Sequence, residues 1–121
     1  MKRAFMEERL IVYLMILKIT PNLKGYRYIK EAAMLVCENG ANTYRTTKNL
    51  FKEIAEIFGE KQTLLDRALR HAIEVSYKRD GIEAFEKATN ISFFDDKPSV
   101  KDVVYVLAEK LSIDLRMNSL I

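Results

Sequence analysis

Five turn signals divide this chain into short segments, and this division limits the folds that the chain can adopt. The signals are Pro21, Asn39-Gly40, Gly59, Asp80-Gly81 and Pro98. Proline disfavours the helical conformation in the residue before it, and glycine commonly ends a helix. Between the signals, apolar residues recur at the three- and four-residue spacing of an amphipathic helix. We therefore expect an all-α fold with about six helices.

The expected helices follow the segments between these signals. They cover residues 7–19, 25–38, 45–58, 63–79, 82–89 and 98–112. Residues 90–97 are expected to form a loop or a short extended stretch, with Phe93 and Phe94 turned inward. Pro98 is expected in the first turn of the last helix, where its missing N–H costs nothing. No repeat or flexible linker interrupts the chain, so residues 1–121 are expected to form a single domain.

The charge of the chain permits a nucleic-acid partner without requiring one. The formal net charge is +3, and residues 1–30 hold seven Lys and Arg but only two acids. The only cysteine, Cys37, excludes an internal disulfide, which is usual in a reducing compartment. The longest apolar run, residues 10–17, is much shorter than the roughly 20 residues that span a bilayer. We expect a cytoplasmic protein with no membrane partner.

The third and fourth expected helices have the spacing of a helix-turn-helix. Two helices joined by a short turn that often holds glycine form this motif, and Gly59 allows the positive φ of such a turn. Ala55, four residues earlier, allows the two helix backbones to cross closely. Leu65, six residues later, returns to the shared core. The spacing predicts the motif, although the same motif also occurs in proteins that bind no DNA.

The fourth expected helix places its side chains on two sides. The apolar side holds Leu65, Ala68, Leu69, Ala72, Val75 and Ser76. The polar side holds Thr63, Arg67, Arg70, Glu74 and Lys78, with Asp66 and His71 on the flanks. Arg67 and Arg70 project together because they are three residues apart, and arginine on guanine is the commonest specific base contact. Residues 61–63 open the helix, where exposed N–H groups favour phosphate. Alternatively, Arg70 and Glu74 form an ordinary surface pair.

Four blocks of residues carry a resemblance to a known family. They are LKGYRYIKEA at 23–32, TKNLF at 47–51, DRALRHAIEV at 66–75 and KPS at 97–99. In this order and spacing they resemble the DNA-binding effector domain of the sporulation initiation response regulators, sporulation stage zero protein A. The resemblance spans about residues 19 to 112, and RHAIEV preceded by an arginine is its most specific part. It implies a six-helix bundle, a recognition helix in the major groove, and transcription regulation at a short DNA box.

The resemblance also implies roles for single residues. Arg67 and Arg70 match the base-reading arginines of the family, and Asp66 stands where the family usually has a glutamate that contacts a base. Leu64 stands where the family commonly has a basic residue, which removes one charged contact. We therefore expect DNA binding with an altered or weaker box preference. The expected contacts to the DNA backbone come from Lys48, Lys61, Gln62, Thr63 and His71.

The residues that enzymes and metal sites require are scarce in this chain. One cysteine and one histidine supply neither a zinc-binding set nor a Cys–His pair. The four glycines are separate and form no phosphate-binding loop, so each is interpreted as helix punctuation. The adjacent acids Asp95 and Asp96 are expected to be solvated in a loop. We expect no enzyme activity, no cofactor and no metal.

The expected partner is double-stranded DNA, and a homodimer on tandem sites or pairing with a full-length regulator remains open. The family also carries a receiver domain, a doubly wound α/β unit with clustered aspartates, and none is expected before residue 20. A stand-alone effector domain is favoured over a fragment of a longer protein. The alternative function is a non-enzymatic interaction module that dimerises with, or modulates, a full-length sporulation-type regulator. Its surface would come from the basic first 30 residues and the apolar residues 10–17 and 103–107.

Overall fold

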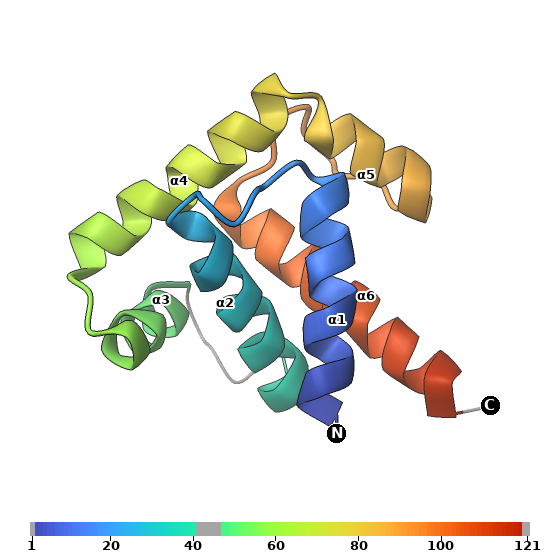
Figure 1. Cartoon of the computed structure of the whole chain (residues 1–121), viewed down its shortest axis with the longest axis horizontal. Coiled ribbons are helices and arrows are strands. Elements are labelled where there is room, and N and C mark those ends of the chain that lie inside the picture. The colour runs from blue at the N-terminus through green and yellow to red at the C-terminus, as the bar shows by residue number, and fades with distance from the viewer. Residues whose placement is uncertain (1, 41–46, 120–121) are drawn as a thin grey trace.

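The structure, a computed structural model, describes residues 2–40 and 47–119, and this part of the chain contains six helices and no strand. The helices are α1 (Lys2–Ile16), α2 (Gly25–Asn39), α3 (Thr47–Phe58), α4 (Gln62–Lys78), α5 (Gly81–Thr89) and α6 (Val100–Ser119), as Figure 1 shows. The expected all-α class is confirmed. None of the helices in the described ranges has the length and apolar character needed to cross a membrane.

Helix α2 lies at the centre of the bundle, and α1, α3, α4 and α6 all pack against it (Figure 1). The core is built from large apolar side chains that are fully buried, each of which stabilises the fold by roughly 1.5–3 kcal/mol. They include Leu10, Leu14, Tyr28, Ile29, Leu50, Ile54, Leu65, Leu69, Phe85 and Leu107. Because α2 and α3 cover one side of α4, the opposite side of α4 faces outward at the edge of the molecule (Figure 1).

Gly25 allows the start of α2 to contact the backbone of α4 directly. A Cβ atom at this position would lie 2.6 Å from the carbonyl oxygen of Ala68 and 2.8 Å from the Cβ of Ala72. No side chain fits in that space. The glycine is therefore a point of close helix contact rather than the helix punctuation that the sequence suggests, and it fixes the middle of α4 against the core.

Helix α1 ends at Ile16, three residues earlier than predicted, in a turn without glycine. Lys18 takes the left-handed conformation there, with φ of 60°. Two reciprocal hydrogen bonds stabilise this turn: the Lys18 Nζ donates to the carbonyl oxygen of Arg79 (2.8 Å), and the Arg79 Nη1 donates to that of Lys18 (3.1 Å). The buried hydroxyl of Ser76 donates to the carbonyl oxygen of Leu17 at 2.6 Å. The end of α1 is thus attached to the end of α4.

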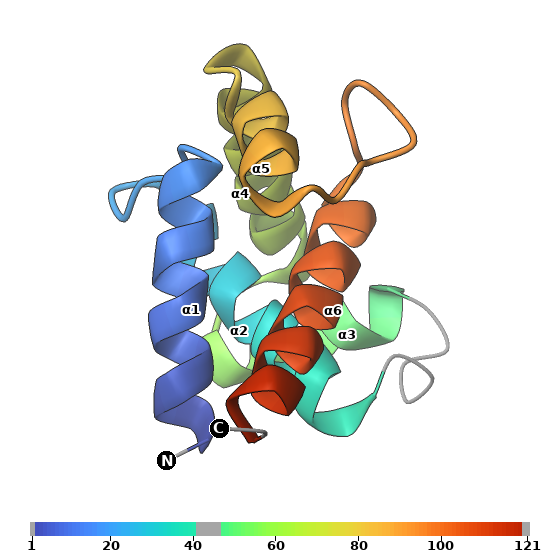
Figure 2. The same ribbon diagram turned by 90° about the vertical axis from the view of Figure 1, so that its right-hand side faces the viewer.

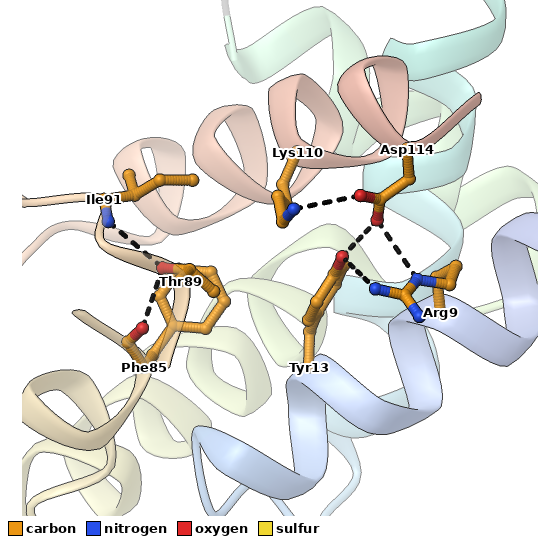
Figure 3. Close-up of polar contacts among 7 residues, drawn as sticks. All are labelled: Arg9, Tyr13, Phe85, Thr89, Ile91, Lys110 and Asp114. Atoms are coloured by element: carbon orange, nitrogen blue, oxygen red, sulfur yellow. Dashed lines mark hydrogen bonds and ion pairs between the residues drawn. The ribbon is translucent and has the colours of Figure 1, made fainter. Parts of the chain in front are cut away.

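A polar network joins the first and last helices (Figure 3). The Asp114 carboxylate on α6 accepts hydrogen bonds from the Tyr13 hydroxyl, from Arg9 Nε at 3.2 Å and from Lys110 Nζ at 2.9 Å. Burial alone would raise the pKa of Asp114, but the bonds from Tyr13, Lys110 and Arg9 outweigh it and hold the pKa below its ordinary value. The pKa of Tyr13 is raised above its ordinary value, mainly by burial of the hydroxyl and secondly by its hydrogen bond to Asp114.

Contacts between distant residues also explain why α1 and α6 are longer than predicted. Helix α1 begins at Lys2 rather than at residue 7, and Arg3 Nη2 pairs with Glu31 (2.8 Å) and Glu38 (3.1 Å) on α2. Helix α6 continues to Ser119 rather than to residue 112, which includes the Asp114 network. Neither extension follows from local sequence, because the stabilising partner lies on another helix.

The segment before α6 differs from the prediction at two residues. Pro98 is buried but lies ahead of the helix, because Ser99 caps it by accepting a hydrogen bond from the Asp102 N–H (3.1 Å). Phe93 is buried against Phe85, as predicted, whereas Phe94 is fully exposed and its predicted inward orientation is wrong. The chain bends from Phe94 onward, and only Phe93 reaches the core.

The side chain of Thr89, the last residue of α5, caps the C-terminal end of that helix. The Thr89 hydroxyl donates to the carbonyl oxygen of Phe85 (2.8 Å) and accepts from the Ile91 N–H (3.2 Å), as Figure 3 shows. Asn90 takes a left-handed conformation with φ of 61°. This turn directs the chain from α5 into the segment that leads to α6.

Candidate nucleic-acid interface

The turn between α3 and α4 has the geometry of a helix-turn-helix. Gly59 has a φ of 63°, the positive value predicted for it. The N–H of Gly59 donates to the carbonyl oxygen of Glu56 (3.3 Å), and that of Glu60 donates to Ala55 (2.9 Å). This pair of bonds is a Schellman motif, which closes the end of α3 and reverses the chain. The turn therefore follows from the glycine.

Small and apolar side chains hold the two helices of the motif together. Ala55 is only 7% exposed, and Leu65 is fully buried in the shared core, as expected for the crossing of α3 over α4. Helix α4 starts at Gln62, after Lys61 in an extended conformation, and no described side chain caps this end. The N–H groups of the first turn therefore remain available to an anion.

The outer side of α4 carries the side chains predicted to contact bases. Arg67 and Arg70 are both exposed, and within the described residues neither guanidinium makes a hydrogen bond or an ion pair. Asp66 is half-buried beside them, and Leu64 is 45% exposed. The structure thus brings the predicted base-contact residues together on one surface of the helix.

The buried side of α4 differs slightly from the predicted apolar side. Leu65, Leu69, Ala72 and Ser76 are buried as predicted, but Ala68 and Val75 are only half-buried. Ile73 is buried although its place in the helical pattern did not assign it to that side. It lines the same groove as the start of α6, and α6 is a second packing partner of α4 outside the motif.

Glu74 does not pair with Arg70, the alternative that the sequence leaves open. Its carboxylate instead contacts the Nζ of Lys97, in the segment before α6, and lies 3.9 Å from that of Lys78 on its own helix. The hydrogen bond from Lys97 lowers the pKa of Glu74 below its ordinary value. Because the Glu74 carboxylate pairs with these two lysines, it does not pair with Arg70, whose side chain is exposed to solvent.

An open groove of about 800 Å³ runs beside α4. Lys48 and Phe51 of α3 line one wall, Asp66 and Arg70 of α4 line the floor, and residues 97–101 line the other wall. In Figure 2, α3 and the loop before α6 project on the same side of the molecule, opposite α1. The groove therefore lies directly beside the surface that carries the arginines.

The residues predicted to contact the DNA backbone lie around the same surface. Lys48 is exposed on α3 at the groove, and Gln62 is half-buried at the start of α4 and also lines the groove. Thr63 and His71 are exposed on α4, and Lys61 is exposed just before the helix begins. The exposure of His71 is not that of a packed core histidine. Of the five predicted residues, Lys48 and Gln62 line the groove itself.

Two basic residues at the groove were not among the predicted contacts. Lys97 and Lys101 line the wall formed by the start of α6, opposite Lys48. They lie 19 and 23 positions beyond Lys78, the last residue of α4, so only the fold brings them to the groove. The KPS block that begins at Lys97 was the available signal.

The acidic, histidine and cysteine side chains in the described ranges do not gather into a candidate metal site. No group of three His, Cys, Asp or Glu side chains there is arranged to hold a metal ion. Asp95 and Asp96 are exposed in the loop before α6. Cys37 is half-buried, with its Sγ 3.6 Å from the hydroxyl of Ser112. The exposed basic surface of α4 and the groove is therefore the candidate functional site.

Comparison with known protein families adds an independent finding. The family model described as "Sporulation initiation factor Spo0A C terminal" matches residues 11–111. The match covers most of the chain: it begins in α1, contains α2 to α5 whole and ends in α6. The helix-turn-helix and both walls of the groove lie inside the matched segment.

Proposed function

This chain belongs to the family of the sporulation initiation factor Spo0A C terminal, and from that premise we propose that it is a sequence-specific DNA-binding transcription regulator. Helix α4 lies in the major groove and contacts base edges of a short DNA box. The family is one of effector domains that are generally DNA-binding and not enzymatic. The box itself and the residues that contact it are part of the proposal.

The observation that carries the proposal is the pair Arg67 and Arg70. Both side chains are exposed on the outer side of α4 and have no partner among the described residues. Each can therefore present its two-pronged donor group to guanine O6 and N7 without first breaking an internal contact. Asp66, next to them, offers an acceptor to a cytosine amino group.

The position of α4 supports its insertion into DNA. The major groove is about 12 Å wide and admits an α-helix. Helix α4 lies at the edge of the molecule, with its outer side clear of the other helices (Figure 1). Lys61 and Thr63 lie at its uncapped start, where phosphate oxygens can accept from backbone N–H groups. These contacts set the orientation of the helix, and the arginines supply the specificity.

The proposal is tested by measuring binding to family-type boxes and to scrambled duplexes of the same composition. We expect the wild-type protein to prefer one box. Arg67→Ala and Arg70→Ala should each cost about 1–3 kcal/mol of binding free energy at that box and relax the preference at one base pair. Lys87→Ala serves as the control, because Lys87 is exposed on α5 away from the groove. Equal affinity of the wild-type protein for all duplexes would contradict the proposal.

A second candidate function is an interaction module, and the outer surface of α1 favours it. Ile11, Val12 and Met15 are large apolar side chains that are 38%, 45% and 70% exposed. They form a surface on which a second copy or a full-length regulator can pack. Val12→Lys with Met15→Lys should abolish such pairing in sedimentation experiments and leave DNA affinity unchanged. Wild-type protein that stays monomeric and captures no regulator in a pull-down would remove this candidate.

A further inference from the structure

We propose that Lys97 and Lys101 form a second wall of the groove that contacts DNA phosphates. In the free protein the Glu74 carboxylate pairs with Lys97, and a DNA phosphate replaces that carboxylate on binding. This inference rests on the proposed function, because it places a DNA strand in the groove beside α4. It adds contacts from a part of the chain outside the helix-turn-helix.

The geometry of the groove provides two separate basic walls. Lys48 stands on the α3 wall, and Lys97 and Lys101 stand on the wall at the start of α6. Arg70 lies on α4 between them. A helix in the major groove has a phosphate backbone on each side of it, so cations on both flanks can contact the two strands of one duplex.

Lys101 is available for such a contact. Its side chain is exposed, and within the described ranges it makes no ion pair or hydrogen bond. It lies one residue into α6, whose start is fixed by the Ser99 cap. The buried Pro98 precedes that cap. The lysine therefore projects from a fixed backbone, which lowers the entropy that binding costs.

Two contacts hold the Lys97 side chain against α4. Its Nζ pairs with the Glu74 carboxylate and lies 5.8 Å from the centre of the Tyr77 ring. Even so, the Lys97 side chain is 49% exposed and the Glu74 side chain is 36% exposed. Exposed ion pairs contribute little stability, so a phosphate oxygen can replace the carboxylate as the partner of Lys97.

Among the acidic residues at the groove, Glu74 is the one that competes with a DNA phosphate for Lys97. Asp66, Glu74 and Asp95 all line the groove. Of these, Glu74 is the one whose carboxylate contacts a groove lysine. In the free protein it cancels part of the positive charge that a phosphate meets. Removing this carboxylate should therefore free Lys97 and strengthen binding to any duplex.

The decisive experiment measures DNA affinity against salt concentration for Lys101→Gln, using the preferred duplex and its scrambled counterpart. Each phosphate contact contributes about 0.9 to the slope of log K against log salt. We expect Lys101→Gln to lower that slope by about this amount and to weaken both duplexes by the same factor. An unchanged slope would show that Lys101 contacts no phosphate and would overturn the proposed second wall. Lys87→Gln on α5 is the matched control and should leave the slope unchanged.

The role of Glu74 is tested by Glu74→Gln, which keeps the size of the side chain and removes its charge. We expect tighter binding to both duplexes and a steeper salt slope, since Lys97 then contributes fully. The control is Glu83→Gln, because Glu83 pairs with Lys87 on the exposed surface of α5. Binding that is unchanged or weaker in Glu74→Gln overturns the competition by Glu74.

The same titrations separate this inference from the proposed function. If Arg70→Ala loses the preference between duplexes while Lys101→Gln keeps the wild-type slope, the wall alone is wrong. If the wild-type protein shows no preference but Lys101→Gln lowers the slope, base recognition is wrong and the wall stands. A wild-type protein that binds neither duplex overturns both.

Discussion

At the scale of single residues, Arg67 and Arg70 differ from Arg3, Arg9, Arg27 and Arg79 in what their guanidinium groups contact. Arg3, Arg9 and Arg79 donate to acceptors on other elements, and Arg27 lies about 5 Å from the rings of Tyr28 and Phe58. Those contacts stabilise the fold, and a ligand would have to break them. The α4 arginines have no such contact to lose within the described residues. The base contacts proposed for these two arginines would therefore break no internal contact.

Leu64 gives a prediction at the same scale. It is 45% exposed on the first turn of α4, at the position where the resemblance described in the sequence analysis implies a basic residue. Leu64→Arg should therefore tighten binding to all duplexes and raise the salt slope by about 0.9, the contribution of one phosphate contact. Gel-shift titrations at several salt concentrations measure both quantities.

The control for Leu64→Arg is Leu64→Gln, which removes the exposed apolar side chain without adding charge. Both variants should unfold at nearly the wild-type denaturant concentration, because substitutions at exposed sites usually change stability by less than about 0.5 kcal/mol. If Leu64→Arg binds no more tightly than Leu64→Gln, this position does not face the DNA backbone.

At the scale of elements, the helix-turn-helix was predictable because its signals are local. Gly59, Ala55 and Leu65 lie within a few residues of one another, and each occupies the predicted place. The end of α1 was not predictable in the same way. Lys18 takes a left-handed conformation that glycine usually adopts, and its reciprocal bonds with Arg79 connect positions 61 residues apart.

The four glycines show the same distinction. Gly40 and Gly59 have positive φ values and end helices, as their place after an apolar segment indicates. Gly25 and Gly81 instead begin helices, at points where a Cβ would meet the backbone of Ala68 or Leu17. A close contact with a distant backbone leaves no local signal, so the sequence identified all four only as punctuation.

Gly59 gives the prediction at this scale. A Cβ at this position would meet no atom within 4 Å, so the cost of Gly59→Ala comes from the left-handed backbone alone. We expect a loss of about 1–2 kcal/mol in the free energy of unfolding, measured by urea denaturation. Gly59→Asn should lose less, because asparagine tolerates this conformation better. Equal losses in the two variants would mean that the turn changes its conformation when it is substituted.

At the scale of the whole molecule, the candidate site depends on contacts that span most of the chain. The α4 surface was predictable from helical periodicity, but the groove beside it needs α3 and α6 both to pack against α4, so that residues of all three helices line it. Lys97 and Lys101 therefore became candidates only with the fold. The predicted helix-turn-helix and base contacts needed only residues 55–71, and the predicted function needed the four blocks between about residues 19 and 112. The charge that surrounds the α4 surface depends on the tertiary structure.

The network at Asp114 closes the bundle in a similar way, because it joins α1 to α6 across about a hundred residues. The groove wall and the network both belong to α6, at its start and near its end. Helix α6 packs on α2 and α1, so the network helps to fix the helix whose start carries Lys101. We expect its loss to lower the stability of the whole domain, rather than to disturb the surface of α4.

The last prediction follows from the pKa of Asp114, which lies below its ordinary value in the folded protein. A carboxyl group with a lowered folded pKa stabilises the fold above its unfolded pKa of about 3.9, and this contribution is lost as the pH falls through the folded pKa. Asp114→Asn should therefore lose about 1–3 kcal/mol of unfolding free energy near neutral pH, because hydrogen bonds to a charged group are removed. Urea denaturation of both proteins across the acid range measures this difference.

The difference between wild type and Asp114→Asn should be constant from about pH 7 to about pH 5 and should shrink at lower pH, as the carboxyl group takes up a proton. Comparing the two proteins at each pH removes the contribution of every other acid in the chain. Glu83→Gln is the control: its carboxylate pairs with Lys87 at 3.2 Å, but both side chains are well exposed, so a small loss that varies little with pH is expected. A difference for Asp114→Asn that stays constant down to about pH 2 would show that the side chain acts by shape and neutral hydrogen bonding, and that its charge does not stabilise the contact between α1 and α6.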